Sequence, residues 1–115
     1  MRADDEPKGE KTMLVVTVMY PGGDGTRFDH AYYRDSHMPL VRRLWEPMGL
    51  RDTQVMRGLP APDGAAAAYL VTTLLTFDSM DGFKSAADQH GAEIFADIPT
   101  FYDGSPALGF YEIAA

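Results

Sequence analysis

Apolar residues form strand-like runs and helix-like patterns that alternate along the chain. Residues 13–20 (MLVVTVMY) and 69–77 (YLVTTLLTF) are rich in β-branched residues and are apolar at odd and even positions alike. This pattern is typical of strands whose two faces are both covered. Shorter runs at 53–57, which is half polar, and at 108–113 predict two further strands.

A helical pattern extends over residues 28–45. One face repeats at three- and four-residue spacing and comprises His30, Tyr33, His37, Leu40, Val41, Leu44 and Met48. Pro39 lies inside this pattern and predicts a kink, or a new helix that begins after Ser36, because proline disfavours helical backbone at the preceding residue. Pro47 and Gly49 predict the end of the helix.

A second helix is predicted to begin after Ser79, a good N-cap residue, and to stop at Gly91. Ile94, Phe95 and Ile98 predict one further short helical turn, which Pro99 ends. The element order is then β-α-β-β-α-β, which indicates an α+β, ferredoxin-like subunit. Helices cover only one face of such a sheet, so we expect a homodimer in which a second copy covers the other face.

Length and composition place the chain among globular proteins. Its 115 residues suffice for one domain, which we assign to residues 12–115, after a charged and flexible N-terminal tail at 1–11. The formal charge of −7 argues against a nucleic-acid partner. The absence of cysteine excludes disulfides and a thiolate metal site. No membrane-length apolar run or secretory signal is present, so we expect a cytoplasmic location.

Two glycine- or histidine-containing patterns are weak signals for cofactors. The loop at 21–25 (PGGDG) precedes a helix, but Phe28 replaces the third glycine of a dinucleotide fingerprint and Asp24 would repel phosphate, so we interpret it as a turn. His30 and His37 are seven residues apart, with no third ligand at a defined spacing. We therefore expect neither a metal nor a cofactor.

His37 is the most informative candidate for chemistry. It lies on an otherwise apolar helix face next to Tyr33, where partial burial would keep the imidazole neutral and able to act as a base. The alternative is a histidine that only packs in the core. The segment 97–103 combines two carboxylates with aromatic residues and is either a second part of a site or a solvated turn. Arg57 is either a surface residue or the partner of an anion, and the roles of His30 and Tyr102 stay open.

Three motifs resemble the EthD family, which is named for a protein of ethyl tert-butyl ether degradation. The first is FDHAYYRDSHMPLV at 28–41, and the others are MRGL at 56–59 and ADIP-x-F at 96–101. The resemblance covers roughly residues 12–114 and implies a dimeric α/β barrel, in which two ferredoxin-like subunits join through their sheets.

The resemblance also implies a range of chemistries. Relatives on this fold include muconolactone isomerases, polyketide decarboxylases and dehydratases, and cofactor-independent monooxygenases, several of which use a histidine in a pocket between helix and sheet. By position, His37 matches that histidine, and Tyr33 and Asp97 are candidate pocket residues. We expect a cofactor-independent enzyme acting on a small apolar or aromatic carbonyl compound. The alternatives are a non-catalytic binding protein of a degradation pathway, a monooxygenase, or a haem protein with His37 as axial ligand.

Overall fold

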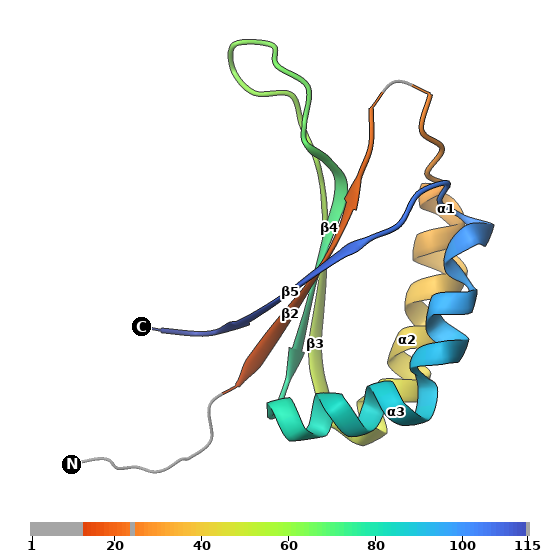
Figure 1. Cartoon of the computed structure of the whole chain (residues 1–115), viewed down its shortest axis with the longest axis vertical. Helices are drawn as coiled ribbons and strands as arrows, with labels where there is room; N and C mark the ends of the chain where they lie inside the picture. Colours follow the sequence, from red (N-terminus) through yellow and green to blue (C-terminus); the bar gives the residue numbers. More distant parts are fainter. Residues whose placement is uncertain (1–12, 24, 115) are drawn as a thin grey trace.

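An antiparallel sheet of four strands forms the frame of the domain. The structure is a computed structural model, and it describes residues 13–23 and 25–114. The strands lie in the order β3-β4-β2-β5 (Figure 1). They are β2 (Leu14–Pro21), β3 (Leu50–Arg57), β4 (Tyr69–Phe77) and β5 (Ala107–Glu112). The tail predicted at 1–11 lies outside the described residues.

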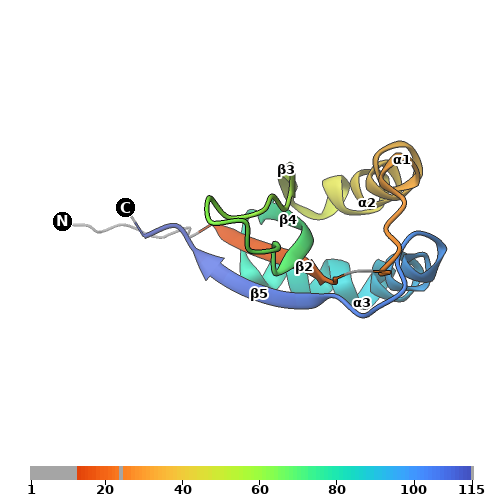
Figure 2. The same ribbon diagram turned by 90° about the horizontal axis from the view of Figure 1, so that it is seen from above.

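Two helical segments connect the strands on one side of the sheet. The first comprises α1 (His30–Tyr32), the π-helical turn η1 (Tyr33–His37), α2 (Met38–Trp45) and the 3-10 turn η2 (Glu46–Met48). The second comprises α3 (Met80–Ala96) and the 3-10 turn η3 (Ile98–Thr100). Both lie against the same face of the sheet (Figure 2). The predicted order β-α-β-β-α-β and the ferredoxin-like fold are confirmed.

The hydrophobic core fills the space between the helices and the covered face of the sheet. Alternate residues of β2 and β4 point into it, including the fully buried Val16, Tyr20, Val71 and Phe77. The indole of Trp45 donates a hydrogen bond of 2.9 Å to the carbonyl of Ala86, which joins α2 to α3 inside the core. The two helices are thereby held at a fixed spacing above the sheet.

The π-helical turn η1 explains why the helix face predicted from the sequence differs from the face that is buried. Pro39 lies in the first turn of α2. Met38, directly before it, keeps helical backbone angles, and its N–H donates a hydrogen bond to the carbonyl of Tyr33. The wider turn inserts one extra residue and rotates the helix that follows. The buried face is therefore Tyr33, His37, Met38, Val41 and Trp45, whereas Leu40, Leu44 and Met48 are only half-buried.

The second helix is longer than predicted. It runs without interruption through Gly91 to Ala96, so the expected stop at Gly91 was wrong. Gly91 is buried, and packing of the helix against the core outweighs the weak helix propensity of a single glycine. Strand β3 also begins three residues earlier than predicted, at Leu50. Gly49 ends the first helical segment as expected, with a φ of 110° that favours glycine.

The opposite face of the sheet is not covered by any element in the described part of the chain. On β2 it carries the half-buried Val15 and Met19, and on β5 Tyr111, which is 56% exposed. Between them, the buried Oγ1 of Thr17 has no hydrogen-bond partner among the described residues. This face is thus partly apolar and contains an unsatisfied polar atom.

Candidate functional site: a histidine–aspartate pair beside a small cavity

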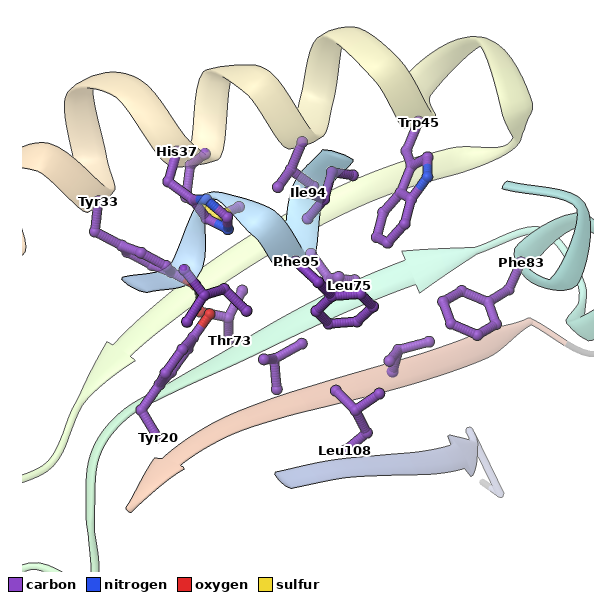
Figure 3. Close-up of a pocket in the computed structure, with 15 residues that line it drawn as sticks. Tyr20, Tyr33, His37, Trp45, Thr73, Leu75, Phe83, Ile94, Phe95 and Leu108 are labelled. Atoms are coloured by element: carbon purple, nitrogen blue, oxygen red, sulfur yellow. Dashed lines mark hydrogen bonds between the residues drawn. The ribbon is translucent and has the colours of Figure 1, made fainter. Parts of the chain in front are cut away.

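The π-helical turn places two aromatic side chains beneath the helix. Tyr33 and His37 lie one turn apart and both point toward the sheet (Figure 3). Their rings stack, with centroids 5.3 Å apart and planes 18° apart. The ring centroid of Phe101, directly after η3, lies 4.6 Å from that of the imidazole and 5.0 Å from that of Tyr33. The His37 ring is therefore held in a cluster of three rings that contact one another.

A carboxylate from the opposite helical segment binds the imidazole. Oδ2 of Asp97 lies 2.9 Å from Nδ1 of His37, and its Oδ1 accepts a hydrogen bond of 2.8 Å from the hydroxyl of Tyr32. His37 is only 3% exposed, whereas the side chain of Asp97 is 20% exposed. Asp97 thus holds the histidine through one oxygen and is itself held through the other.

Burial and the carboxylate act on the imidazole in opposite directions. Burial lowers the pKa of His37 below its usual value, and the hydrogen bond and negative charge of Asp97 partly offset that effect. A neutral ring that bonds to a carboxylate through Nδ1 carries its proton on Nδ1. Nε2 then keeps its lone pair, and it makes no hydrogen bond within the described part of the chain. This arrangement makes Nε2 a proton acceptor.

His37 lines a cavity between the helices and the sheet. The space open to the centre of a water molecule is about 30 Å³, which is room for about two water molecules. The walls are apolar apart from His37 and the hydroxyls of Tyr20, Tyr33 and Thr73 (Figure 3). Phe95 and Leu108, each 41% exposed, lie at the rim. A ligand larger than water enters only if such rim side chains move aside.

The hydroxyl groups in the cavity are neutral donors. The hydroxyl of Tyr33 lies 2.6 Å from Oγ1 of Thr73, not against His37. Burial raises the pKa of Tyr33, and burial together with the neighbouring Tyr33 raises the pKa of Tyr20. Both phenols therefore stay protonated at neutral pH. Tyr33 contributes its ring to His37 and its hydroxyl to the cavity wall.

The segment that carries Asp97 is anchored to the start of the first helical segment. The guanidinium of Arg27 donates to the carbonyls of Pro99 and Thr100, both at 3.0 Å, and to Asp103 at 3.2 Å. The Tyr102 hydroxyl donates to the carbonyl of Pro21. These bonds connect residues far apart in sequence and fix the position from which Asp97 reaches His37.

Two of the predicted site residues come together and the third plays a different part. His37 and Asp97 are hydrogen-bonded, while Tyr33 stacks on the ring without bonding to it. Tyr32 was missed because the three- and four-residue spacing assigned Tyr33 to the inner face of the helix, and not its neighbour Tyr32. Tyr102 donates its hydroxyl to the carbonyl of Pro21 at the end of β2. Arg57 and His30 lie outside the cavity. Within residues 13–23 and 25–114, no three His, Asp or Glu side chains gather as metal ligands.

Comparison with known proteins identifies the family. The model of the EthD domain matches residues 25–105, so the chain belongs to the EthD family. An EthD-like protein from Ralstonia eutropha JMP134 is 37% identical, with a TM-score of 0.85 over 92% of this chain and 96% of that one. The comparison with curated proteins gives no match.

More distant solved structures share the fold. An ethyl tert-butyl ether degradation (EthD) family protein from Bacillus halodurans C-125 is 20% identical over 90% of this chain and 99% of that one, with a TM-score of 0.68. SnoaB from Streptomyces nogalater, a cofactor-independent oxygenase solved as a point mutant, is 12% identical, with a TM-score of 0.57 over 91% and 94% of the two chains. No helix in the described part of the chain is both long and apolar enough to cross a membrane.

Proposed function

We propose that the protein is a cofactor-independent enzyme that moves a proton on a small apolar or aromatic carbonyl compound. The observation that carries this proposal is the buried His37, whose Nδ1 is bonded to Asp97 while Nε2 makes no hydrogen bond to any described residue. A histidine that only packed in the core would also need a hydrogen-bond partner, but it would need neither an adjoining cavity nor an Nε2 without a partner. Membership of the EthD family supports a role in small-molecule metabolism, and the pair of His37 and Asp97 supports proton transfer as the chemistry.

In the proposed reaction, Nε2 of His37 takes a proton from the carbon next to the carbonyl group. The electron pair of the broken C–H bond moves onto the carbonyl oxygen and gives an enolate, while the imidazole becomes an imidazolium stabilised by Asp97. The hydroxyl of Tyr33 donates to the enolate oxygen as its charge develops. His37 then returns the proton to the same or a neighbouring carbon, so isomerisation and dehydration both start from this step.

The apolar walls of the cavity support a small, uncharged substrate body. A ligand must displace the rim side chains Phe95 and Leu108 to enter, because the cavity itself has room for about two water molecules. Once inside, it would be held away from water, where the pull of Asp97 on the imidazolium is strengthened. Asp97 is a positioning residue in this scheme, and His37 and Tyr33 touch the substrate.

We further propose that the enzyme works as a homodimer joined through the uncovered sheet face. Val15 and Met19 on that face would be removed from water, and the unsatisfied Oγ1 of Thr17 would gain a partner. Sedimentation of the purified protein should give a dimer at micromolar concentration, and Met19→Lys should give a monomer. A monomeric native protein would contradict this part of the proposal.

The function can be tested before the natural substrate is known. A panel of small ketones, lactones and aromatic carbonyl compounds in D₂O is followed by NMR for exchange of the protons next to the carbonyl group. The native protein should accelerate exchange in part of the panel, and His37→Gln should lose about 100-fold or more of that rate. The control is His90→Gln, a change on α3 at a histidine that does not line the cavity.

The same experiment separates the alternatives. If compounds bind with unchanged exchange, the protein is a binding protein and the proposal is wrong. If a compound consumes dissolved oxygen in the presence of the protein, the activity is that of a monooxygenase. Exchange that survives His37→Gln would show that another group moves the proton.

A further inference from the structure

A hollow lined by arginines lies on the other side of the helical segment that carries His37. Its charged lining is Arg34, Arg42 and Arg57, and its other titratable lining residues are His30 and Tyr33. Its open volume is about 300 Å³, and the exposed Val55 contributes an apolar patch. It adjoins a second hollow of about 380 Å³, with which it shares His30 and Arg57. The two form one groove on the outside of the domain.

The groove is cationic in a protein whose overall charge is negative. Ten Lys and Arg residues stand against seventeen Asp and Glu residues in the chain, yet none of the described carboxylates lines either hollow. Three of the ten cationic side chains therefore line a groove that none of the described acidic side chains lines. Such segregation is not expected from a surface that serves only to keep the protein in solution.

Two of the three arginines have no acidic partner among the described residues. Arg34 is paired with Asp35 at 2.8 Å. Arg42 donates to the hydroxyl of Thr53 at 3.1 Å, a neutral acceptor that leaves the guanidinium charge unbalanced. Arg57 makes no ion pair in the same part of the chain. Arg42 and Arg57 are thus available to bind an anion.

The pKa of His30 depends on the charges around this groove. Burial lowers the pKa of its imidazole, and the positive charge of Arg57 lowers it further. The carboxylate of Asp29 at the start of α1 acts in the opposite direction, but less strongly. An anion held by Arg57 would offset the arginine charge, so the imidazole can report on whether the groove is occupied.

The adjoining hollow differs in character. Its walls are mostly glycines and small or apolar side chains, among them Gly22, Gly23, Ala66, Ala67 and Leu70. These walls can contact a flat or branched apolar group. Among the described residues, the shared His30 and Arg57 are the only titratable groups that they contain. The groove as a whole therefore presents a part with three arginines beside a part whose side chains are mostly uncharged, small or apolar.

We propose that this groove binds a small organic acid, with its anionic group between Arg57 and Arg42 and its apolar body in the adjoining hollow. Planar guanidinium groups suit carboxylate or phosphate oxygens because they donate two parallel hydrogen bonds. The site is separate from the His37 cavity, since only Tyr33 and Met38 line both. It makes no use of the proposed proton transfer and does not depend on it.

The test uses benzoate as the probe acid, with His30 as the reporter. NMR of the imidazole follows titration of the full-length protein with benzoate, with benzyl alcohol as its uncharged counterpart, and with inorganic phosphate. Benzoate should shift the His30 signals in a saturable manner and raise the pKa of His30, because an anion next to the ring favours the imidazolium. Benzyl alcohol should give no saturable shift.

Matched variants separate a site from general attraction between charges. Arg57→Gln should weaken benzoate binding about tenfold, which is the loss expected for one charge-assisted pair of hydrogen bonds. Arg43→Gln removes the same charge one residue from Arg42, at an exposed position outside the groove, and should leave the affinity nearly unchanged. Circular dichroism on both variants confirms that the fold is intact.

The other results would overturn the proposal. Equal weakening by Arg43→Gln would show general attraction between charges and no site. Phosphate that binds as tightly as benzoate would show that the apolar hollow contributes nothing, which contradicts the organic acid. The absence of saturable shifts with benzoate would show that the groove does not bind an organic acid.

Discussion

The two sides of the first helical segment present histidines in opposite settings. His37 faces inward and is hydrogen-bonded to a carboxylate beside an apolar cavity, whereas His30 faces an open groove together with three arginines. Burial lowers the pKa of both rings. The neighbouring charges differ, since Asp97 opposes the effect at His37 and Arg57 adds to it at His30.

This difference shows that the partner of an imidazole determines what it can do. A ring bonded to a carboxylate has a fixed tautomer and can hold a proton for a short time, as proton transfer requires. A ring beside an arginine resists protonation until an anion arrives, as suits a binding site. Seven residues separate the two histidines, so their environments come from the tertiary fold and not from the local sequence.

After the loss of His37 itself, the largest expected effect comes from removing the carboxylate charge that distinguishes the inner site. Asp97→Asn should slow the proton exchange by at least about tenfold, because an amide can donate as well as accept and no longer fixes the proton on Nδ1. The matched control is Asp88→Asn, on the exposed face of α3. Exchange measured by NMR on both variants checks this, and an unchanged rate in Asp97→Asn would remove Asp97 from the mechanism.

The second prediction concerns stability at mildly acidic pH. The pKa of His37 is lowered by folding, so the unfolded chain binds more protons than the native protein once the pH falls below about 6.5. The free energy of unfolding should therefore decrease from that pH downward, by at most about 1.4 kcal/mol per pH unit from this ring, and level off below the native pKa. Urea unfolding across this range measures the slope.

Histidine variants assign that slope to the inner or the outer site. His37→Gln should reduce it more than His30→Gln, because His37 is buried and His30 is only half-buried. An equal reduction by the two variants would show that the inner and outer rings do not differ as described.

The smallest expected effect comes from a substitution that strengthens α3, which ends at Ala96, directly before Asp97. A methyl group at Gly91 would meet Cβ of Ala87 at 3.8 Å and the ring of Phe95 at 3.9 Å, which are ordinary contacts. Gly91→Ala should therefore raise the free energy of unfolding by about 0.5–1 kcal/mol, by the gain in helix propensity. Thermal unfolding measures it, and benzoate binding in the outer groove should not change. A lower melting temperature would show that the helix needs glycine there for packing.

The sequence predicted the elements and half of the site. Continuous apolar runs rich in β-branched residues located β2 and β4, and the periodicity over 28–45 located the first helical segment together with His37 and Tyr33. The π-helical turn could not be predicted, since Pro39 signals an interruption without its form, and the burial of Leu40 and Leu44 was overestimated for that reason. The predicted end of the second helix at Gly91 relied on the low helix propensity of glycine, which the packing of α3 against the core outweighs.

Contacts between segments that are far apart in the sequence could not be predicted from local patterns. The pairing of Asp97 with Tyr32 joins residues 65 positions apart, and the bond between Arg42 and Thr53 joins α2 to β3. The arginine groove combines side chains of α1, η1, α2 and β3, and the sequence analysis had singled out only Arg57 among its arginines. Charge clusters built from several elements become visible only in the fold.

The measurement that tests the central claim most directly is a ¹⁵N NMR titration of the histidine rings. We predict that at neutral pH His37 is neutral, with its proton on Nδ1 and an unprotonated Nε2, and that it titrates below the usual histidine pKa of about 6.5. Asp97→Asn should abolish the preference for the Nδ1 tautomer. A proton on Nε2, or a His37 that is charged at neutral pH, would contradict the account.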